Sequence, residues 1–310
     1  MPVPGRSVVC FSYLAAASLW KVGRFPAANH GAEIDAIEES IAADGPMVTA
    51  VLEALGQPSL LLSNNIFDDR NGDQAAAWLR RHRVTATAGR TAGAATPQIT
   101  IIGDRHHTRT MFPYLPGIAR ELERIDLTPL NAASFAYVDC YGLIQRPAVR
   151  VIQAAREARV PLLANLGGDN PSADILDALD GYHGLVVQTS ITEESLDTAA
   201  RLVKYLQADM RSEWAVITAG AAGAAAANAR DLVYVPAFRA DVRHTHCAGA
   251  AFSGGLIYGL VRSWPMHETL NLANASGALR CEREQNEPMP TLTELRSAVR
   301  SRQRVDAPAA

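Results

Sequence analysis

The second half of the chain alternates short apolar runs with amphipathic stretches, and this alternation limits the folds open to it. Strands are predicted by apolar runs, and helices by segments with apolar residues on one face. The predicted strands are 135–138, 160–164, 185–187 and 214–218, and the predicted helices between them include 147–159 and 192–207. Connections of this length are crossovers between parallel strands. The pattern therefore predicts an α/β fold with a doubly wound, mostly parallel sheet.

The first half interrupts this rhythm. Residues 98–102 and 108–112 flank a polar tip, which is typical of a β-hairpin. We expect a small N-terminal β flap, or lid, formed by segments around 10–45 and 95–115. The flap belongs to one α/β domain over residues 7–285. Residues 286–310 are rich in Pro, Arg and Ala, and we expect them to form a disordered polar tail.

Composition excludes nucleic-acid binding and a membrane-spanning segment, and cysteine usage favours one cellular setting. The 310 residues carry a net charge of −3, so there is no basic footprint for nucleic acid. No run of 18 apolar residues exists, which excludes a membrane span. The four cysteines show no C-x-x-C spacing, which favours a reducing, cytoplasmic setting.

The first seventeen residues allow two interpretations. Arg6 followed by apolar residues up to Ala17 has the outline of a secretory signal peptide. The alternative is a buried first strand over residues 8–14. We favour the strand, because the rest of the sheet needs one here.

The most specific segment reads H-T-H-C-A-G-A-A-F-S-G-G over residues 244–255. Small residues before a helix expose backbone N–H groups beside the positive end of its dipole, and this arrangement binds phosphate. A loop packed closely against the sheet also needs small residues. Spacing alone leaves both interpretations open.

Four segments in order resemble the ribokinase-like (PfkB) carbohydrate kinases. Residues 244–252 resemble that family's D-T-x-G-A-G-D-x-F signature. The family's V-T-x-G-x-x-G, D-D-x-x-G and A-N-A-x-x-A patterns are similar to residues 216–224, 68–72 and 273–278. The resemblance covers about residues 7–285. It implies a ribokinase-like fold and ATP-dependent phosphoryl transfer to a sugar or nucleoside hydroxyl.

The catalytic positions depart from the family pattern. The final Asp of the signature is the family's general base, and here it is Ala250, which cannot accept a proton. The resemblance places the anion hole at Cys247, Ala248 and Gly249, with Cys247 in place of a glycine. His246 and a neighbouring carboxylate are the candidate replacement bases.

The substrate-binding positions also differ. The resemblance places Ala16 where the family has a sugar-binding Asp, and Met47 where it has a sugar-binding Asn. The middle-sheet D-x-N pattern keeps only Asn165, because Ala164 replaces its Asp.

The nucleotide side retains more of the pattern. The resemblance assigns Thr218, Gly220, Gly223 and Asn274 to an ATP or ADP site. Glu194 corresponds to the family's Mg²⁺-region acid. The alternative for residues 192–194 is an ordinary helix start with a Thr cap and an acidic first turn.

Two histidine pairs invite other interpretations. His106 and His107 lie at the hairpin tip, where adjacent strand residues point to opposite faces, so a solvated tip is favoured over a metal site. His244 and His246 could form a metal or acid–base cluster with Cys247. Substitution in a site that has lost its chemistry is the favoured explanation.

These observations predict a PfkB-type carbohydrate or nucleoside kinase homologue that keeps nucleotide binding, with lost or weakened phosphotransfer. One alternative is an active kinase of an unusual hydroxylated substrate that uses a different base. Another is an enzyme of a different reaction class that reuses the pocket. The expected partners are a small-molecule ligand and a second copy of the chain, joined through the β flap.

Overall fold

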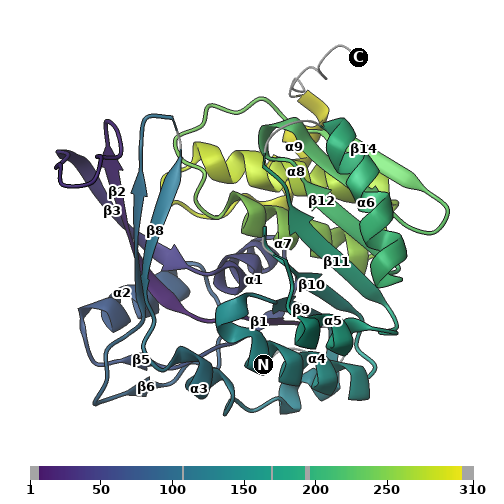
Figure 1. Ribbon diagram of the computed structural model, residues 1–310, viewed down its shortest axis with the longest axis horizontal. Helices are drawn as coiled ribbons and strands as arrows, with labels where there is room; N and C mark the ends of the chain where they lie inside the picture. The colour runs from purple at the N-terminus through teal and green to yellow at the C-terminus, as the bar shows by residue number, and fades with distance from the viewer. Residues whose placement is uncertain (1–6, 107, 169, 193–195, 302–310) are drawn as a thin grey trace.

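The computed structural model describes residues 7–301, apart from 107, 169 and 193–195. A large eight-stranded sheet has helices on both faces, and a separate four-stranded sheet stands beside one of its edges (Figure 1). The α/β ribokinase-like fold class with a small flap is confirmed. Among the described helices, none is both long and apolar enough to cross a bilayer.

The large sheet has the order β14-β13-β12-β11-β10-β9-β1-β4. Six neighbouring strands, from β12 to β4, are parallel. The strands are β1 (Ser7–Phe11), β4 (Ser59–Leu62), β9 (Ala133–Asp139), β10 (Leu162–Asn165), β11 (Leu185–Ser190), β12 (Trp214–Thr218), β13 (Gly223–Ala227) and β14 (Leu232–Pro236). Residues 7–11 thus form a buried strand near one edge of the sheet, as the second interpretation of the N-terminal segment predicts.

Side chains of β1 alternate between two apolar cores, as the period of a strand requires. Val8 and Cys10 belong to one core, and Val9 and Phe11 belong to the other. The first core is covered by α1 (Asp44–Ala54), α2 (Arg70–Arg81), α7 (Ala248–Val261), α8 (Met266–Glu282) and α9 (Leu292–Ser301). The second face is covered by α3 (Ile118–Leu122), α4 (Gln145–Glu157), α5 (Ala173–Leu179) and α6 (Leu196–Met210).

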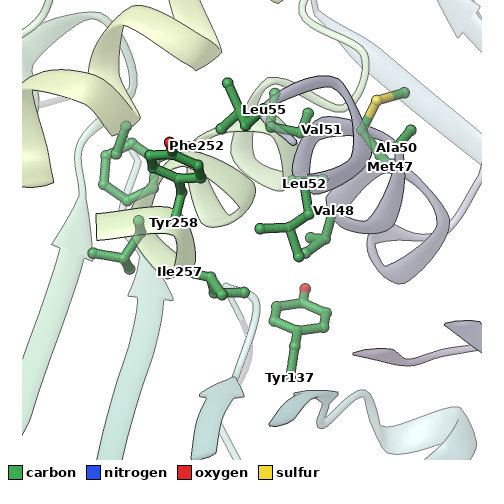
Figure 2. Packing of buried hydrophobic residues seen from close by; sticks show 14 of the residues in the cluster. Met47, Val48, Ala50, Val51, Leu52, Leu55, Tyr137, Phe252, Ile257 and Tyr258 are labelled. Atoms are coloured by element: carbon green, nitrogen blue, oxygen red, sulfur yellow. The ribbon is translucent and has the colours of Figure 1, made fainter. Parts of the chain in front are cut away.

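Helices α1 and α7 pack closely in the first core (Figure 2). A Cβ at Gly254 would lie 2.7 Å from Val51, and a Cβ at Gly255 would lie 2.9 Å from the Ala273 backbone. Small residues in α7 therefore allow close helix packing on two sides. The close-packing explanation of the small residues holds for this part of the 244–255 segment.

The flap is the sheet β3-β2-β7-β8. Its strands are β2 (Ala15–Val22), β3 (Ile34–Ala42), β7 (Gln98–Gly103) and β8 (Arg109–Tyr114). Two short strands, β5 (Ile66–Phe67) and β6 (Arg90–Thr91), pair beside α2. The inner face of the flap has a small apolar core, whereas every residue of β8 is exposed.

The sequence pattern misses one strand and mistakes one helix. It does not predict β13, which pairs antiparallel with both β12 and β14 in the mostly parallel sheet. Its sequence, GAAAA, has no strand propensity to reveal it, and burial decides its conformation. The expected disordered tail is wrong over Leu292–Ser301, which forms α9, because Leu295 and Ala298 are buried against the first core.

Candidate functional site

The carboxyl ends of the parallel strands meet at one edge, where ligands bind in open α/β sheets. Helix α1 precedes β4, and α7 follows β14, so both helices begin at this same edge. His246 ties them together, because its Nε2 donates to the Ile41 carbonyl oxygen at 2.8 Å. The start of α7 therefore lies beside the start of α1, under the flap.

A buried carboxylate organises this edge. Asp139, at the end of β9, has no exposed surface. It accepts hydrogen bonds from the Ser12 hydroxyl (2.5 Å), the Tyr137 hydroxyl (2.5 Å), the Asn165 amide (2.9 Å) and the Gly45 N–H (3.1 Å). Burial, and then the neighbouring charge of Asp44, raise the pKa of Asp139 to about 7.

Asp44 is the half-buried partner of this group, at the first turn of α1. Its Oδ2 accepts from the Tyr141 hydroxyl at 2.5 Å and from the Asn165 amide at 3.1 Å. Burial raises the pKa of Asp44, whereas the hydrogen bonds and the charge of Arg109 lower it. Since Asn165 contacts both carboxylates, Asp44 and Asp139 titrate as a pair that holds a proton near neutral pH.

Both helices start with strained backbone. Ala43 has φ 83° and ψ 158°, a combination that only glycine adopts easily. Cys247 has φ 59° and ψ 22°, in the left-handed region. Cys247 stands where the sequence resemblance has glycine, so the backbone there keeps a glycine-like path without glycine.

The replacement base predicted at His246 is weak. Burial, and then the charge of Arg280, lower the pKa of His246 to about 3. Its Nε2 also contacts the Cys247 sulfur at 3.3 Å, and burial raises the pKa of that thiol to about 12. Neither side chain is poised to take a proton at neutral pH. Among the residues described, no three metal-ligating side chains lie close enough to hold an ion.

The first turn of α7 offers a ligand only backbone groups. Ala250 is 1% exposed and carries no polar atom. Gly249 is exposed, and a Cβ there would meet nothing within 4 Å. The helix has no side-chain cap. The Ala248 N–H donates to the Thr245 carbonyl oxygen at 3.3 Å, which leaves the N–H of the exposed Gly249 as the group that suits an anion.

The predicted substrate positions separate into two kinds. Ala16 is buried in the flap sheet opposite Ile41, and Met47 is fully buried in the core beside Val51 (Figure 2). Only Asn165 presents a polar group at the edge, and that group holds the two carboxylates.

The pfkB family carbohydrate kinase profile matches residues 48–292, most of the chain. The chain belongs to the PfkB family. A curated relative, aminoimidazole riboside kinase from Salmonella typhimurium, is 28% identical over 231 residues, covering 67% of this chain and 72% of the relative.

Solved structures share the fold at lower identity. A Burkholderia thailandensis nucleoside kinase in complex with inosine has a TM-score of 0.78 at 17% identity, covering 95% of this chain and 97% of that one. A ribokinase from Arabidopsis thaliana complexed with ribose and ATP has a TM-score of 0.75 at 15% identity, covering 95% and 99%.

PfkB kinases use ATP and Mg²⁺. The residues that the sequence resemblance assigns to nucleotide binding lie around the ends of β12 and β14 and on α8. Thr218 is half-buried at the end of β12, and Gly220 is exposed in the turn that follows, with φ 49°. Gly223 has φ 122°, and a Cβ there would lie 2.3 Å from the Val235 carbonyl oxygen. The Asn274 amide donates to the carbonyls of Val235 (2.9 Å) and Pro236 (3.2 Å), so it ties the end of β14, which pairs with Gly223, to α8. The predicted metal residue Glu194 lies outside the described residues.

Sequence reasoning missed Ser12, Asp44, Asp139 and Tyr141. Asp139 directly follows a buried apolar run, so the rule that ligands gather at strand ends could have found it. Asp44 had no such signal, because only the Asn165 and Tyr141 contacts reveal its place.

Proposed function

We propose that this chain is a PfkB-family sugar or nucleoside kinase homologue that binds adenine nucleotide and a hydroxylated small molecule, with weakened phosphotransfer. The observation that carries this is the first turn of α7. Its helix start has no side-chain cap and an exposed Gly249 whose N–H suits a phosphate, while Ala250 offers no base. Losing general-base assistance costs about 10²–10⁴ in rate.

The neighbouring positions support the same conclusion. Ala16 and Met47 are buried apolar side chains, so they cannot orient a sugar hydroxyl. Orientation supplies several kcal/mol of barrier lowering in well-positioned reactions. The names of the relatives, which include riboside, nucleoside and ribose kinases, favour a ribose-containing ligand.

One observation favours a second candidate, an active kinase with a relocated base. Asp44 is a half-exposed carboxylate at the edge where α7 begins, and its pKa is raised by burial. A carboxylate with a raised pKa is a stronger base than a free one. In this candidate, Asp44 takes the hydroxyl proton in place of Ala250.

ATP turnover across a panel of sugars and nucleosides decides between the two. We expect slow turnover in the native chain and little change in Asp44→Asn. Turnover of about 1 s⁻¹ or more, in the usual enzyme range, that falls at least a hundredfold in Asp44→Asn would establish the second candidate. Asp174→Asn, an exposed acid in the first turn of α5, is the matched control.

We also propose that the chain forms a homodimer through the flap and works in a reducing, cytoplasmic setting. Ile37, Met111, Phe112 and Tyr114 are each more than half exposed on the two edge strands of the flap. Exposed strand edges with apolar side chains favour pairing with another chain. All four cysteines are free and buried. Light scattering at micromolar concentration tests the dimer, and a monomer would refute it.

A further inference from the structure

A cavity of about 310 Å³ lies between the flap and the loop that leads into α7. Flap strands β2, β7 and β8 form one wall, and residues 243–246 with Gln285 form the other. His246 lines it and is the neighbour of Cys247, the residue before α7. The cavity therefore adjoins the edge where the kinase chemistry of this family takes place.

The charged residues that line this cavity are mostly basic. They are Lys21, Arg105, Arg109 and Arg243, against Asp35 and Asp104. Lys21 pairs with Glu38 and Arg243 with Glu284. Within the described part of the chain, Arg105 and Arg109 have no carboxylate within ion-pair distance. Arg109 donates instead to the Thr245 carbonyl oxygen at 3.0 Å.

A third unpaired cation lies behind the wall. Arg280 is fully buried and donates to the Gln285 side-chain oxygen (2.6 Å) and the Glu284 carbonyl (3.2 Å). Its Nε has no hydrogen-bond partner, and no described carboxylate forms an ion pair with it. A buried charge without a counterion is costly, so an anion nearby would relieve it.

Two lining residues carry unsatisfied polar atoms as well. His244 and Gln285 are 9% and 2% exposed, and His244 Nδ1 and Gln285 Nε2 have no partner. A buried polar atom without a hydrogen-bond partner destabilises the fold. His244 Nε2 donates to the Arg283 carbonyl at 2.8 Å, so Nδ1 is the free nitrogen of this ring.

The local potential is positive. Burial, and then the charges of Arg280, Lys21 and Arg109, lower the pKa of His244 to about 4. Those cations come from α8, β2 and β8, so their positive charges act on the cavity from both walls.

We propose that this cavity is a subsite for an anionic group, a phosphate ester or a carboxylate, on the small-molecule ligand of this protein. Its oxygens accept from Arg109 and from the free Gln285 amide, in the field of Arg280. An anion beside His244 also raises the pKa of that ring, and the protonated ring donates through Nδ1. Describing the ligand as a kinase-type substrate rests on the proposed function, whereas the anion site itself does not.

Calorimetry without nucleotide tests the site, with sulfate, ribose 5-phosphate, ribonate and ribose as probes. The pocket variant is Lys21→Gln/Arg109→Gln. The control, Arg146→Gln/Arg201→Gln, removes the same charge from exposed positions on α4 and α6. We expect the pocket variant to weaken sulfate binding about tenfold or more, as for the loss of charged hydrogen bonds. The control should change it less than twofold.

Equal sulfate binding in the pocket and control variants would overturn the proposal. Tighter binding of ribose 5-phosphate or ribonate than of ribose assigns the ester or the carboxylate. Ribose that binds as well as both anionic sugars would refute an anionic ligand. Arg105→Gln, at the exposed flap tip, should weaken sulfate binding several-fold and serves if the double variant fails to fold.

A separate ATP titration distinguishes this proposal from the proposed function. Sulfate binding that depends on Lys21 and Arg109 supports the anion site even if ATP does not bind. Conversely, ATP binding with no pocket-dependent sulfate binding refutes the anion site alone.

Discussion

The two halves of the ligand-binding edge are built in different ways. The half that we propose binds nucleotide relies on backbone: Gly220 and Gly223 shape the turn after β12, and the Asn274 amide holds the end of β14, with which Gly223 pairs. The substrate half relies on side chains, chiefly Asp44, Asp139 and Asn165, and on cations of the flap. Backbone-made sites survive side-chain substitution, whereas side-chain sites change their chemistry with each replacement. In the proposed function, this difference accounts for the family-like residues of the nucleotide half and for the departures in the substrate half.

The largest expected effect comes from a substitution in the nucleotide half. Gly223→Ala places a Cβ 2.3 Å from the Val235 carbonyl oxygen at φ 122°. We expect a loss of about 3 kcal/mol in the free energy of unfolding, since backbone strain and a clash add. Urea denaturation measures it.

Gly249→Ala is the matched control for this prediction. The added methyl at Gly249 meets nothing within 4 Å, and alanine favours a helix. Stability should stay the same or rise by less than about 1 kcal/mol. Equal losses in the two variants would contradict the backbone-made description of the nucleotide half.

Acid should unfold the protein through buried histidines, two of which lie in the substrate half. Burial lowers the pKa of His82 and His244 to about 4 and that of His246 to about 3. Unfolded histidine takes up a proton near pH 6.5, so stability is lost as the pH falls from about 6.5 towards 4. Asp139 acts oppositely, because its pKa of about 7 keeps it protonated in the folded chain while the unfolded chain releases that proton.

The three histidines change the free energy of unfolding with pH more than Asp44 and Asp139 do. We expect the free energy of unfolding to fall by about 1–3 kcal/mol between pH 6.5 and pH 5. Denaturation at both pH values checks this. His82 lies at the C-terminal end of α2. His82→Asn should reduce the slope of the unfolding free energy against pH by one proton. A slope that disappears in this variant would show that the substrate half contributes nothing.

Strain at the start of α1 predicts a smaller effect in the substrate half. Ala43→Gly removes the cost of φ 83°, and we expect stability to rise by about 1 kcal/mol. Ala42→Gly, one residue earlier in an ordinary strand, should instead reduce stability. The melting temperatures of both variants provide the test, and a loss in Ala43→Gly would show that this backbone is not strained.

The smallest expected effect concerns the missing base. Ala250 is 1% exposed, so Ala250→Asp would bury a carboxylate with no side-chain partner prepared for it. Ala16 and Met47 still leave the hydroxyl unpositioned. We expect ATP turnover on the sugar and nucleoside panel to rise less than tenfold, the low end of general-base effects. A much larger rise would show that the substrate half lacks only its base.

The sequence predicted the fold class, because strand and helix periods recur at crossover lengths that allow few topologies. It also predicted a small separate β sheet, whereas the missing base at Ala250 stays a prediction. It failed for β13 and α9. Five small residues have no strand propensity of their own, and the polar tail shows its helix only through Leu295 and Ala298 docking on the core.

Local sequence by itself determined most of the strands and helices, though not β13 and α9, and the residues present at each family position, since those depend on periodicity and residue type. Only the tertiary structure decided that Asp44 and Asp139 share Asn165, and that Arg109 from the flap meets the loop before α7. Residues 44 and 139 are far apart in the chain, and so are 109 and 245. Their contacts depend on how the sheet, the flap and the two helix starts pack, which no local pattern encodes.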